Sequence, residues 1–310
     1  MQQSRLATPA LPRRLVILKR EWPLYVMLIP GVAFVFVFSY LPMFGLVMAF
    51  QNYSPLRSFS GSEWVGLKNF QAMLSLPTFW TVVRNTLMIS SVKIVLRLLV
   101  PLVIALLLNE VYNNAFKRTA QTVFFLPYFL SWAVMGGVLR ELFEYDGTVN
   151  ALLQSLGADP IMFLGSNTWF PIIVIVSDVW KDMGYNMIIF LAAITNVDPA
   201  LNESAALDGA NRWHQTWHIT LPTIRPIIVM LLVLALGTVF SAGQEQIMLL
   251  YNPMVYQSSD IIDTLVYRTG LVNHQWSLSA AVGMMKSVIS FLLVAFSYRL
   301  ATKYFDYQVF

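Results

Sequence analysis

The stretch LYVMLIPGVAFVFVFSYLPMFGLVMAF, residues 24–50, decides the fold class, because it contains no charged side chain. A helix needs about 20 predominantly apolar residues to cross the hydrocarbon core of a bilayer. Pro30 and Pro42 predict kinks in such a helix rather than its end. The basic residues before it are followed by an apolar run too long for the core of a signal peptide. Residues 24–50 therefore predict a retained first membrane span.

Five further apolar stretches follow the first one along the chain. Hydrophobic residues make up 57% of the 310 residues and charged residues only 12%, whereas soluble domains carry about 25% charge. The sequence therefore predicts an all-α integral membrane protein with about six transmembrane helices, in which residues 24–310 form the membrane domain. The remaining stretches are 86–108, 119–143, 170–195, 224–243 and 279–302.

The distribution of Lys and Arg predicts the orientation in the membrane, because cytoplasmic loops are enriched in these residues. With a cytoplasmic N-terminal segment 1–23, eleven basic residues lie inside: Arg5, Arg13, Arg14, Lys19, Arg20, Lys117, Arg118, Arg212, Arg225, Arg299 and Lys303. Five lie outside or at the outer boundary: Arg57, Lys68, Arg84, Arg140 and Arg268. We therefore expect both termini and the loop 196–223 in the cytoplasm, with segments 51–85, 144–169 and 244–278 outside.

Several function classes are disfavoured by what the sequence does not contain. It has no cysteine, which excludes disulfides and thiolate chemistry. It has no G-x-x-x-x-G-K-[ST] motif to hold nucleotide phosphates. The net charge of +4 follows the loops and so indicates membrane orientation rather than nucleic-acid binding. We expect no catalytic residue, no metal site and no cofactor within the chain.

Charged residues interrupt two of the expected spans. Asp178, Lys181 and Asp182 lie near the middle of 170–195, and Lys93 and Arg97 lie in 86–108. Each charge costs roughly 2.5–3.5 kcal/mol at the centre of a membrane helix, so the fourth span should face the bundle or a hydrated cavity. Spacings of four place the two carboxylates on one helix face and the two cations on another, where they can pair. These charges could line a polar translocation path or form a purely structural ion-pair network, and the sequence does not decide between the two roles.

The loop NVDPALNESAALDGANRWHQTWHITLPTIR, residues 196–225, has the chemistry of two short helices. Asp198 is a candidate N-cap with Pro199 at the first helical position. Gly209 permits a sharp change of backbone direction. A second amphipathic helix carries Trp213, Trp217 and Ile219, and we expect Pro222 to end it. Two short helices around a glycine form a compact knob suited to docking in a groove, or alternatively an interfacial loop with tryptophans at headgroup level.

This loop resembles the EAA loop of permease subunits of binding-protein-dependent ABC importers. The matching residues are Glu203, Ser204, Ala205, Asp208, Gly209, Ala210, Ile219, Leu221 and Pro222. The chain departs from the family pattern at Ser204, where Ala is usual, and at Thr216, where Phe is usual. Outside the loop, MAFQNYSP (48–55), WVGLKNF (64–70), ALLLNEVYNNAFKRTAQTVFFLPYFLSW (105–132) and WKDMGYNMIIFLAAI (180–194) resemble the branch that imports oligosaccharides and polysaccharide fragments, including acidic ones such as alginate.

The resemblance implies a type I ABC importer-like permease fold in the bacterial cytoplasmic (inner) membrane. It implies a second, different permease subunit, two ATPase subunits that carry ATP and Mg, and an external solute-binding protein. The loop around Glu203–Pro222 would insert into a cleft of the ATPase and transmit its closure to the pore. Trp132 and Asn186, from two of the segments quoted above, join the five intramembrane charges as candidates for the translocation path of a saccharide.

Two other function classes remain at this stage. A carrier driven by an ion gradient would use Asp178 or Asp182 as a proton site. An intramembrane enzyme would use His214 and His218, which have metal-ligand spacing but lack the H-E-x-x-H pattern. A requirement for ATP hydrolysis separates the importer from the carrier.

Overall fold

The computed structural model describes residues 13–237 and 239–305, which are almost entirely helical. The described strands form one short antiparallel hairpin, β1 (Gln51–Asn52) with β2 (Glu63–Trp64). Most of the predicted N-terminal segment, including Arg5, lies outside the described residues. Its remaining part, 13–23, belongs to α1 (Arg13–Val35), so the first helix begins earlier than predicted.

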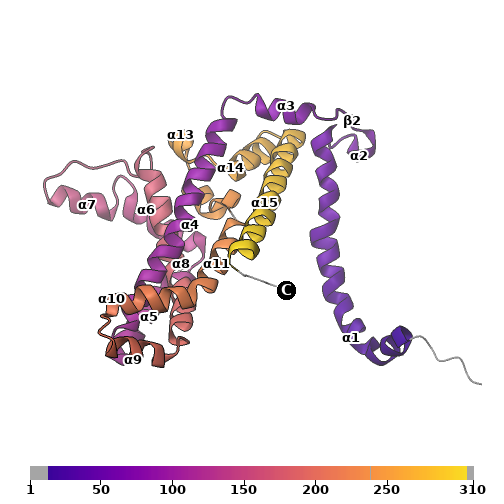
Figure 1. Ribbon diagram of the computed structural model, residues 1–310. Coiled ribbons are helices and arrows are strands. Elements are labelled where there is room, and N and C mark those ends of the chain that lie inside the picture. The colour runs from indigo at the N-terminus through magenta and orange to yellow at the C-terminus, as the bar shows by residue number, and fades with distance from the viewer. Residues whose placement is uncertain (1–12, 238, 306–310) are drawn as a thin grey trace, which may run out of the picture.

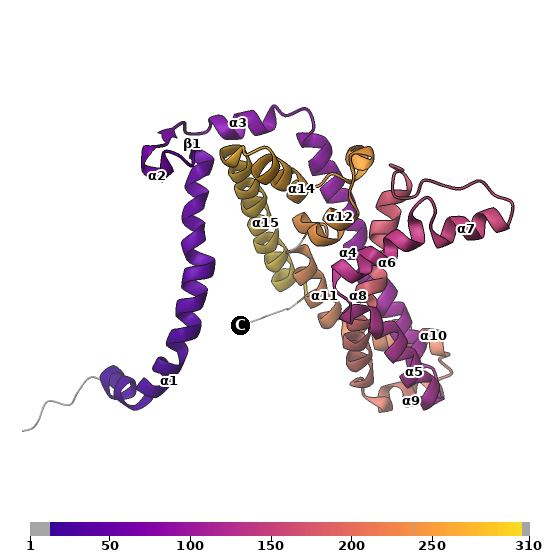
Figure 2. The same ribbon diagram turned by 180° about the vertical axis from the view of Figure 1, so that it is seen from behind.

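The first span is one helical segment that changes type along its length. After α1 come a π-helical turn, η1 (Phe36–Tyr40), and a 3₁₀ segment, η2 (Leu41–Phe50). Pro42 has no N–H to donate, and in the turn before it the N–H of Leu41 donates to the carbonyl of Phe36. Figures 1 and 2 show α1 standing apart from the remaining helices, and an apolar stretch of 18 residues within Glu21–Phe50 has no buried residue.

The number of membrane-spanning segments agrees broadly with the predicted six. Four described segments are long and apolar enough to cross a membrane: Glu21–Phe50, Phe79–Asn109, Arg212–Leu236 and Trp276–Arg299. A bent helix pair makes a fifth. The charged helix α8 (Trp169–Thr195) has 27 residues and about 40 Å of length, which suffices for a sixth. It packs along α4 (Phe79–Asn109).

The third predicted span, 119–143, is strongly bent. The chain there forms α5 (Asn114–Phe125), a 3₁₀ turn η3 (Leu126–Phe129) and α6 (Trp132–Phe143). The segments Asn114–Phe129 and Trp132–Ser155 meet at 102°. Pro127 opens η3, and the Ser131 hydroxyl then accepts the N–H of Val134 at 3.3 Å, which starts a new helix in a new direction.

The fifth span also differs from the predicted 224–243. Its helix is continuous from Arg212 and ends at Leu236 in α11 (Leu221–Leu236). After the 3₁₀ turn η5 (Val239–Ser241), the backbone is left-handed at Ala242 (φ 38°) and Gly243 (φ 85°), and a separate helix α12 (Gln244–Leu250) follows. The sixth span, α15 (Trp276–Phe305), contains the predicted 279–302.

The loops gather at two opposite ends of the molecule (Figures 1 and 2). One end holds the predicted outer segments, with α2 (Ser58–Gly61), α3 (Lys68–Leu74), η6 (Pro253–Val255), α13 (Tyr256–Ser259), α14 (Ile262–Tyr267) and η7 (Arg268–Val272). α7 (Thr148–Ser155) projects sideways beyond α6. The other end holds α5 with α9 (Pro199–Leu207), α10 (Arg212–Gln215) and η4 (Thr216–Thr220).

Buried apolar side chains hold each end to the long helices. Phe190, Met187 and Ile224 join α8 to α11 beside the second end. Phe79 and Ile262 belong to a cluster that joins α4, α14 and α15 at the first end. The ends are therefore attached to the same helices, α4 and α8, that carry the intramembrane charges.

Candidate functional site

The loop between α8 and α11 has the local geometry that its sequence predicts. The Asp198 carboxylate accepts the N–H of Ala200 at 2.9 Å and caps α9, with Pro199 at the first helical position. Gly209 has φ +84°. This left-handed conformation is free of steric cost for glycine but unfavourable for a residue that has a side chain. The N–H of Ala210 then donates a hydrogen bond to the carbonyl of Ala205 at 2.9 Å, which caps the C-terminal end of α9.

The second half of the loop departs from its prediction at Pro222. Asn211 caps α10 by accepting the N–H of His214 at 2.9 Å, as a short second helix requires. Pro222 was expected to end this helix, but the helix runs through it as one segment, Arg212–Leu236. A π-helical turn precedes Pro222, in which the N–H of Leu221 donates to the carbonyl of Thr216. This wider turn lets the helix continue although the proline has no N–H.

The knob formed by α9 and α10 exposes the residues of the EAA-like pattern. Glu203, Ser204 and Asp208 are exposed, while Ala205 and Ala210 are half-buried. Leu207, the last residue of α9, is 91% exposed. Ile219 and Leu221 pack inward on the Phe190 cluster.

The charges of α4 and α8 meet in one ion cluster, as their spacing predicted. Lys93 Nζ lies 3.0 Å from Asp178 Oδ1, and both side chains are buried. Arg97 forms a two-pronged contact with Asp178, through Nε to Oδ2 at 2.6 Å and Nη2 to Oδ1 at 2.8 Å. Arg97 Nη2 also pairs with Asp182 at 2.8 Å. Asn186 donates to the Arg97 carbonyl at 3.3 Å. Five of the seven residues predicted for the translocation path therefore lie together.

Lys181 of α8 contacts residues of η3 and α6 rather than the ion cluster. Lys181 Nζ donates to the carbonyl of Tyr128 at 2.9 Å and lies 5.5 Å and 5.6 Å from the ring centres of Tyr128 and Trp132. Within the described residues Lys181 has no ion pair. Its charge is therefore held by a carbonyl dipole and two aromatic faces rather than by a carboxylate.

The ion cluster also holds the break in the fifth span, which sequence reasoning missed. Lys93 Nζ donates to the carbonyl of Ala242 at 2.9 Å and to Gln246 Oε1 at 2.7 Å. Gln246 in turn donates to Ser177 Oγ and to the carbonyl of Val174, each at 2.8 Å. The polar run Gln244–Gln246 directly after Gly243 was the available signal for a discontinuous helix.

A cavity of about 290 Å³ lies beside this break, lined by residues of α4, α12 and the start of α6, among them Arg97, Trp132 and Glu245. Ser90 also lines it, and the buried Ser90 hydroxyl has no hydrogen-bond partner among the described residues. An unsatisfied buried hydroxyl is costly unless a ligand or water binds it. The arrangement can bind polar molecules by hydrogen bonds and an aromatic face, but it holds no nucleophile and base in contact.

The two histidines considered for an enzyme do not converge on a common point. The His214 and His218 rings stack with centres 5.9 Å apart. His214 Nδ1 contacts Asn211, and His218 Nδ1 contacts the carbonyl of His214 within the same helix. Among residues 13–237 and 239–305 there is no cluster of three His, Cys, Asp or Glu side chains that would hold a metal ion.

A long bundle with a charged mid-membrane break and a two-helix knob at one end defines a transport subunit. Residues 97–306 match the family model described as "Binding-protein-dependent transport system inner membrane component", and the chain belongs to this family. It is a permease subunit of a sugar ABC importer, not an enzyme, and ATP is hydrolysed on partner subunits. The two alternative interpretations, a carrier driven by an ion gradient and an intramembrane enzyme, are therefore wrong.

Relatives and solved structures agree with this family over nearly the whole chain. The chain is 41% identical over 293 residues, covering 94% of itself and 91% of the relative, to the polygalacturonan/rhamnogalacturonan transport system permease protein YteP of Bacillus subtilis (strain 168). It is similar to a chain of a bacterial ABC transporter that imports the acidic polysaccharide alginate, with TM-score 0.88, 36% identity and coverage of 95% and 100%. A second alginate transporter structure, in complex with an alginate pentasaccharide-bound periplasmic protein, matches with TM-score 0.88, 35% identity and coverage of 96% and 100%.

Proposed function

We propose that this chain forms one half of the translocation pore of an ATP-driven importer of oligosaccharides or polysaccharide fragments, and that the loop 196–223 couples it to a separate ATPase. The observation that carries the coupling role is the knob of α9 and α10. It combines a glycine in the left-handed region, exposed Glu203 and Asp208, and the exposed side chain of Leu207. Such a partly apolar two-helix projection suits insertion into a groove of a partner.

The assembly that we propose has the composition usual for this family. The chain pairs with a second permease subunit, and the pair rests on two ATPase subunits that bind ATP and Mg. An external solute-binding protein delivers the saccharide at the opposite end. Both termini lie in the cytoplasm of a bacterial cell, whose inner membrane holds the complex. Two facts support this orientation: the Lys and Arg asymmetry, and the N-terminal end of α1, which lies at the same end of the molecule as α9 and α10 (Figure 1).

The intramembrane charges fall into two groups in this proposal, one with a structural role and one that lines the translocation path. Lys93 and Asp178 are buried and fully engaged, so they hold α4, α8 and the break of the fifth span together. Arg97 and Asp182 keep 34% and 26% of their side chains exposed, so they face the path. Arg97, Trp132 and the Ser90 hydroxyl line the cavity of about 290 Å³, which in this proposal is the part of the path that admits the saccharide.

The substrate that fits these charges best is an acidic saccharide. Lys93 and Arg97 are balanced by Asp178 and Asp182, which leaves Lys181 as the cation without a counter-ion in this region of the described chain. A uronate carboxylate in the path would supply one. The relative named for polygalacturonan and rhamnogalacturonan, and the two alginate transporters, point to the same class of substrate.

Purification of the tagged chain tests the proposed assembly. We expect a second permease and an ATPase to copurify with it, and reconstituted complex to accumulate a pentasaccharide only with ATP and a loaded solute-binding protein. Vanadate should stop this uptake. Uptake driven by a proton gradient without ATP, or purification of the chain alone under conditions that keep it folded, would overturn the proposal.

A further inference from the structure

A second cavity, of about 640 Å³, lies at the end of the molecule opposite the coupling loop. One wall is the start of α4 with the turn before it, including Thr78 and Val82. The other wall is the segment from Tyr256 to Gln275. This cavity is separate from the mid-membrane one, with which it shares no lining residue.

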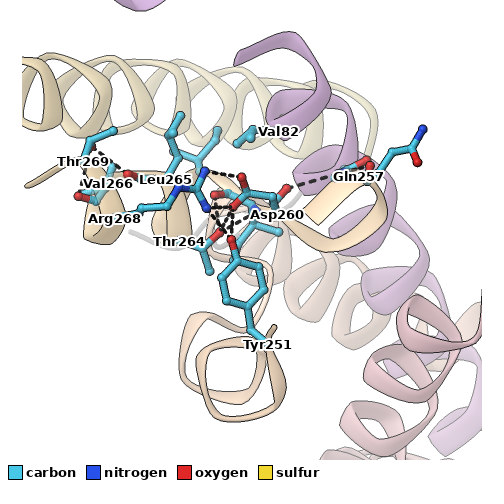
Figure 3. A network of polar contacts seen from close by, with 12 residues as sticks. Val82, Tyr251, Gln257, Asp260, Thr264, Leu265, Val266, Arg268 and Thr269 are labelled. Carbon is cyan, nitrogen blue, oxygen red and sulfur yellow. Dashed lines mark hydrogen bonds and ion pairs between the residues drawn. The ribbon is translucent and has the colours of Figure 1, made fainter. Parts of the chain in front are cut away.

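A network of polar contacts links the residues of the second wall (Figure 3). Asp260, 3% exposed, accepts the Tyr251 hydroxyl at 2.7 Å and the Thr264 hydroxyl at 2.6 Å through Oδ1. Arg268 Nη2 donates to Asp260 Oδ2 at 2.5 Å, and its Nη1 donates to the Tyr251 hydroxyl at 2.5 Å. Burial, followed by the hydrogen bond to Asp260, raises the pKa of Tyr251, so its hydroxyl stays protonated as a donor. Asn85 fixes the same wall to α4 through the Gln257 and Asp260 carbonyls at 3.0 Å and 3.3 Å.

Unusual backbone presents the amide side chains of this wall to the cavity. The π-helical turn η7 closes with the N–H of Asn273 on the carbonyl of Arg268 at 2.9 Å. His274 then takes φ 55°, a strained conformation for a residue with a side chain. The N–H of Gln275 is fixed to the carbonyl of Thr269 at 2.8 Å. Asn273 and Gln275 line the cavity, and neither side chain has a hydrogen-bond partner within the described residues.

The charge and shape of the lining define the ligand chemistry. The charged lining residues are Asp260 and Arg268, which neutralise each other. Tyr256 is covered by Tyr251, stacked at 4.6 Å, and by the Arg268 guanidinium at 4.7 Å, so it offers an edge rather than a stacking face. What remains is a set of neutral amides and hydroxyls beside the apolar side chains of Leu76 and Pro77. A saccharide fits such a lining, because a sugar carries hydroxyl groups around an apolar ring face.

The geometry points to a saccharide subsite in this cavity, in which Asn273 and Gln275 hydrogen-bond the hydroxyl groups of the incoming chain before it enters the mid-membrane path. This subsite rests on the proposed import function, because only then does the cavity lie at the entrance. It recognises hydroxyls rather than carboxylates, so an acidic saccharide and a neutral one bind it alike. A flat protein-docking surface would not need a concave site with unengaged amides.

Direct binding to the complete complex in nanodiscs, without solute-binding protein, tests the subsite. The probes are a galacturonate pentasaccharide and an arabinose pentasaccharide, titrated by calorimetry. For the double variant N273A/Q275A we expect Kd to rise about tenfold for both probes, because two hydrogen bonds are lost. The control Gln71→Ala removes an exposed amide from α3, outside the cavity, and should leave Kd unchanged.

Three outcomes would overturn the subsite. These are no measurable binding to the wild-type complex, an unchanged Kd in the double variant, or a loss of affinity for the acidic probe alone. An unchanged Kd together with a higher half-saturating concentration of solute-binding protein would assign the cavity to protein docking instead. Uptake from loaded binding protein, measured on the same preparations, tests the proposed function separately, since wild-type uptake with unaltered Kd in the variant rejects only the subsite.

Discussion

Lys93 of α4 and Asp178 of α8 form a 3.0 Å ion pair in which side-chain exposures are 4% and 1%. The same ammonium group holds the Ala242 carbonyl at the break of the fifth span. One buried lysine therefore joins three of the membrane segments. A buried pair of this kind stabilises little relative to apolar residues, but breaking it leaves an uncompensated charge.

Asp178→Asn should destabilise the subunit by about 3–5 kcal/mol, because Lys93 would keep a buried charge with no full counter-ion. Thermal unfolding in detergent measures this. Asp182→Asn is the matched control and should cost much less, since 26% of that side chain is exposed. The double variant K93M/D178L should recover most of the loss, and a double variant as unstable as Asp178→Asn would contradict this account.

Gly243→Ala should impair transport, because this glycine has φ +85° and an added Cβ would lie 2.6 Å from Lys93 Nζ. We expect a cost of about 1–3 kcal/mol and a displaced Lys93. Uptake and melting temperature are the measurements. Gly283→Ala, where a Cβ meets nothing within 4 Å, should leave both unchanged or raise the melting temperature. Equal behaviour of the two variants would show that the break is not held by Lys93.

Gly184→Ala should loosen the packing of α8 on α5, because the added Cβ would collide with the Phe124 carbonyl and the Phe125 backbone. Overpacking of this kind costs about 1–3 kcal/mol. The melting temperature should fall, whereas Gly137→Ala, which meets nothing within 4 Å, should not lower it. A melting temperature equal to wild type for Gly184→Ala would mean that the two helices separate without cost.

Gly209→Val should uncouple ATP hydrolysis from transport, since a β-branched residue does not adopt φ +84° without strain and the knob would change shape. We expect the ratio of ATP hydrolysed to saccharide imported to rise severalfold in proteoliposomes. Gly209→Asn is the matched control, because asparagine tolerates the left-handed region. Normal substrate-stimulated ATPase activity and uptake in Gly209→Val would refute the coupling role.

Lys181→Gln should reduce uptake of an acidic oligosaccharide more than uptake of a neutral one. A charge at 4 Å contributes about 1 kcal/mol even in water, so the selectivity should fall about fivefold or more. Competing uptake of galacturonate and arabinose pentasaccharides measures this selectivity directly. Equal loss for both would show that Lys181 only packs against Tyr128 and Trp132.

Local chemistry explains which site features were predictable. Asp198, Pro199 and Gly209 act through their own backbone, so the helix start and the left-handed turn are readable from adjacent residues. The pairing of Lys93 and Arg97 with the carboxylates followed from helical spacing. Spacing did not reveal that Lys181 points to Tyr128 instead, because the rotation of α8 depends on its neighbours. Lys286 likewise pairs with Asp263 across 23 residues, a partner that no periodicity indicates.

The sequence by itself determined the membrane class, the approximate number of spans, the charges that must be sheltered and the two short helices of the loop 196–223, because each depends on composition or on residues within one helical turn. Only the tertiary structure decided the bend near Pro127, the continuous helix through Pro222, the break at Gly243 and the cavity walled by Asn273 and Gln275. At the bend and at the break, carbonyl groups accept hydrogen bonds from lysines distant in the chain, and the walls of the cavity come from distant segments, which only folding brings together. At Pro222 the π-helical turn Thr216–Thr220 lets the helix continue, a change of helix type that the proline alone does not indicate.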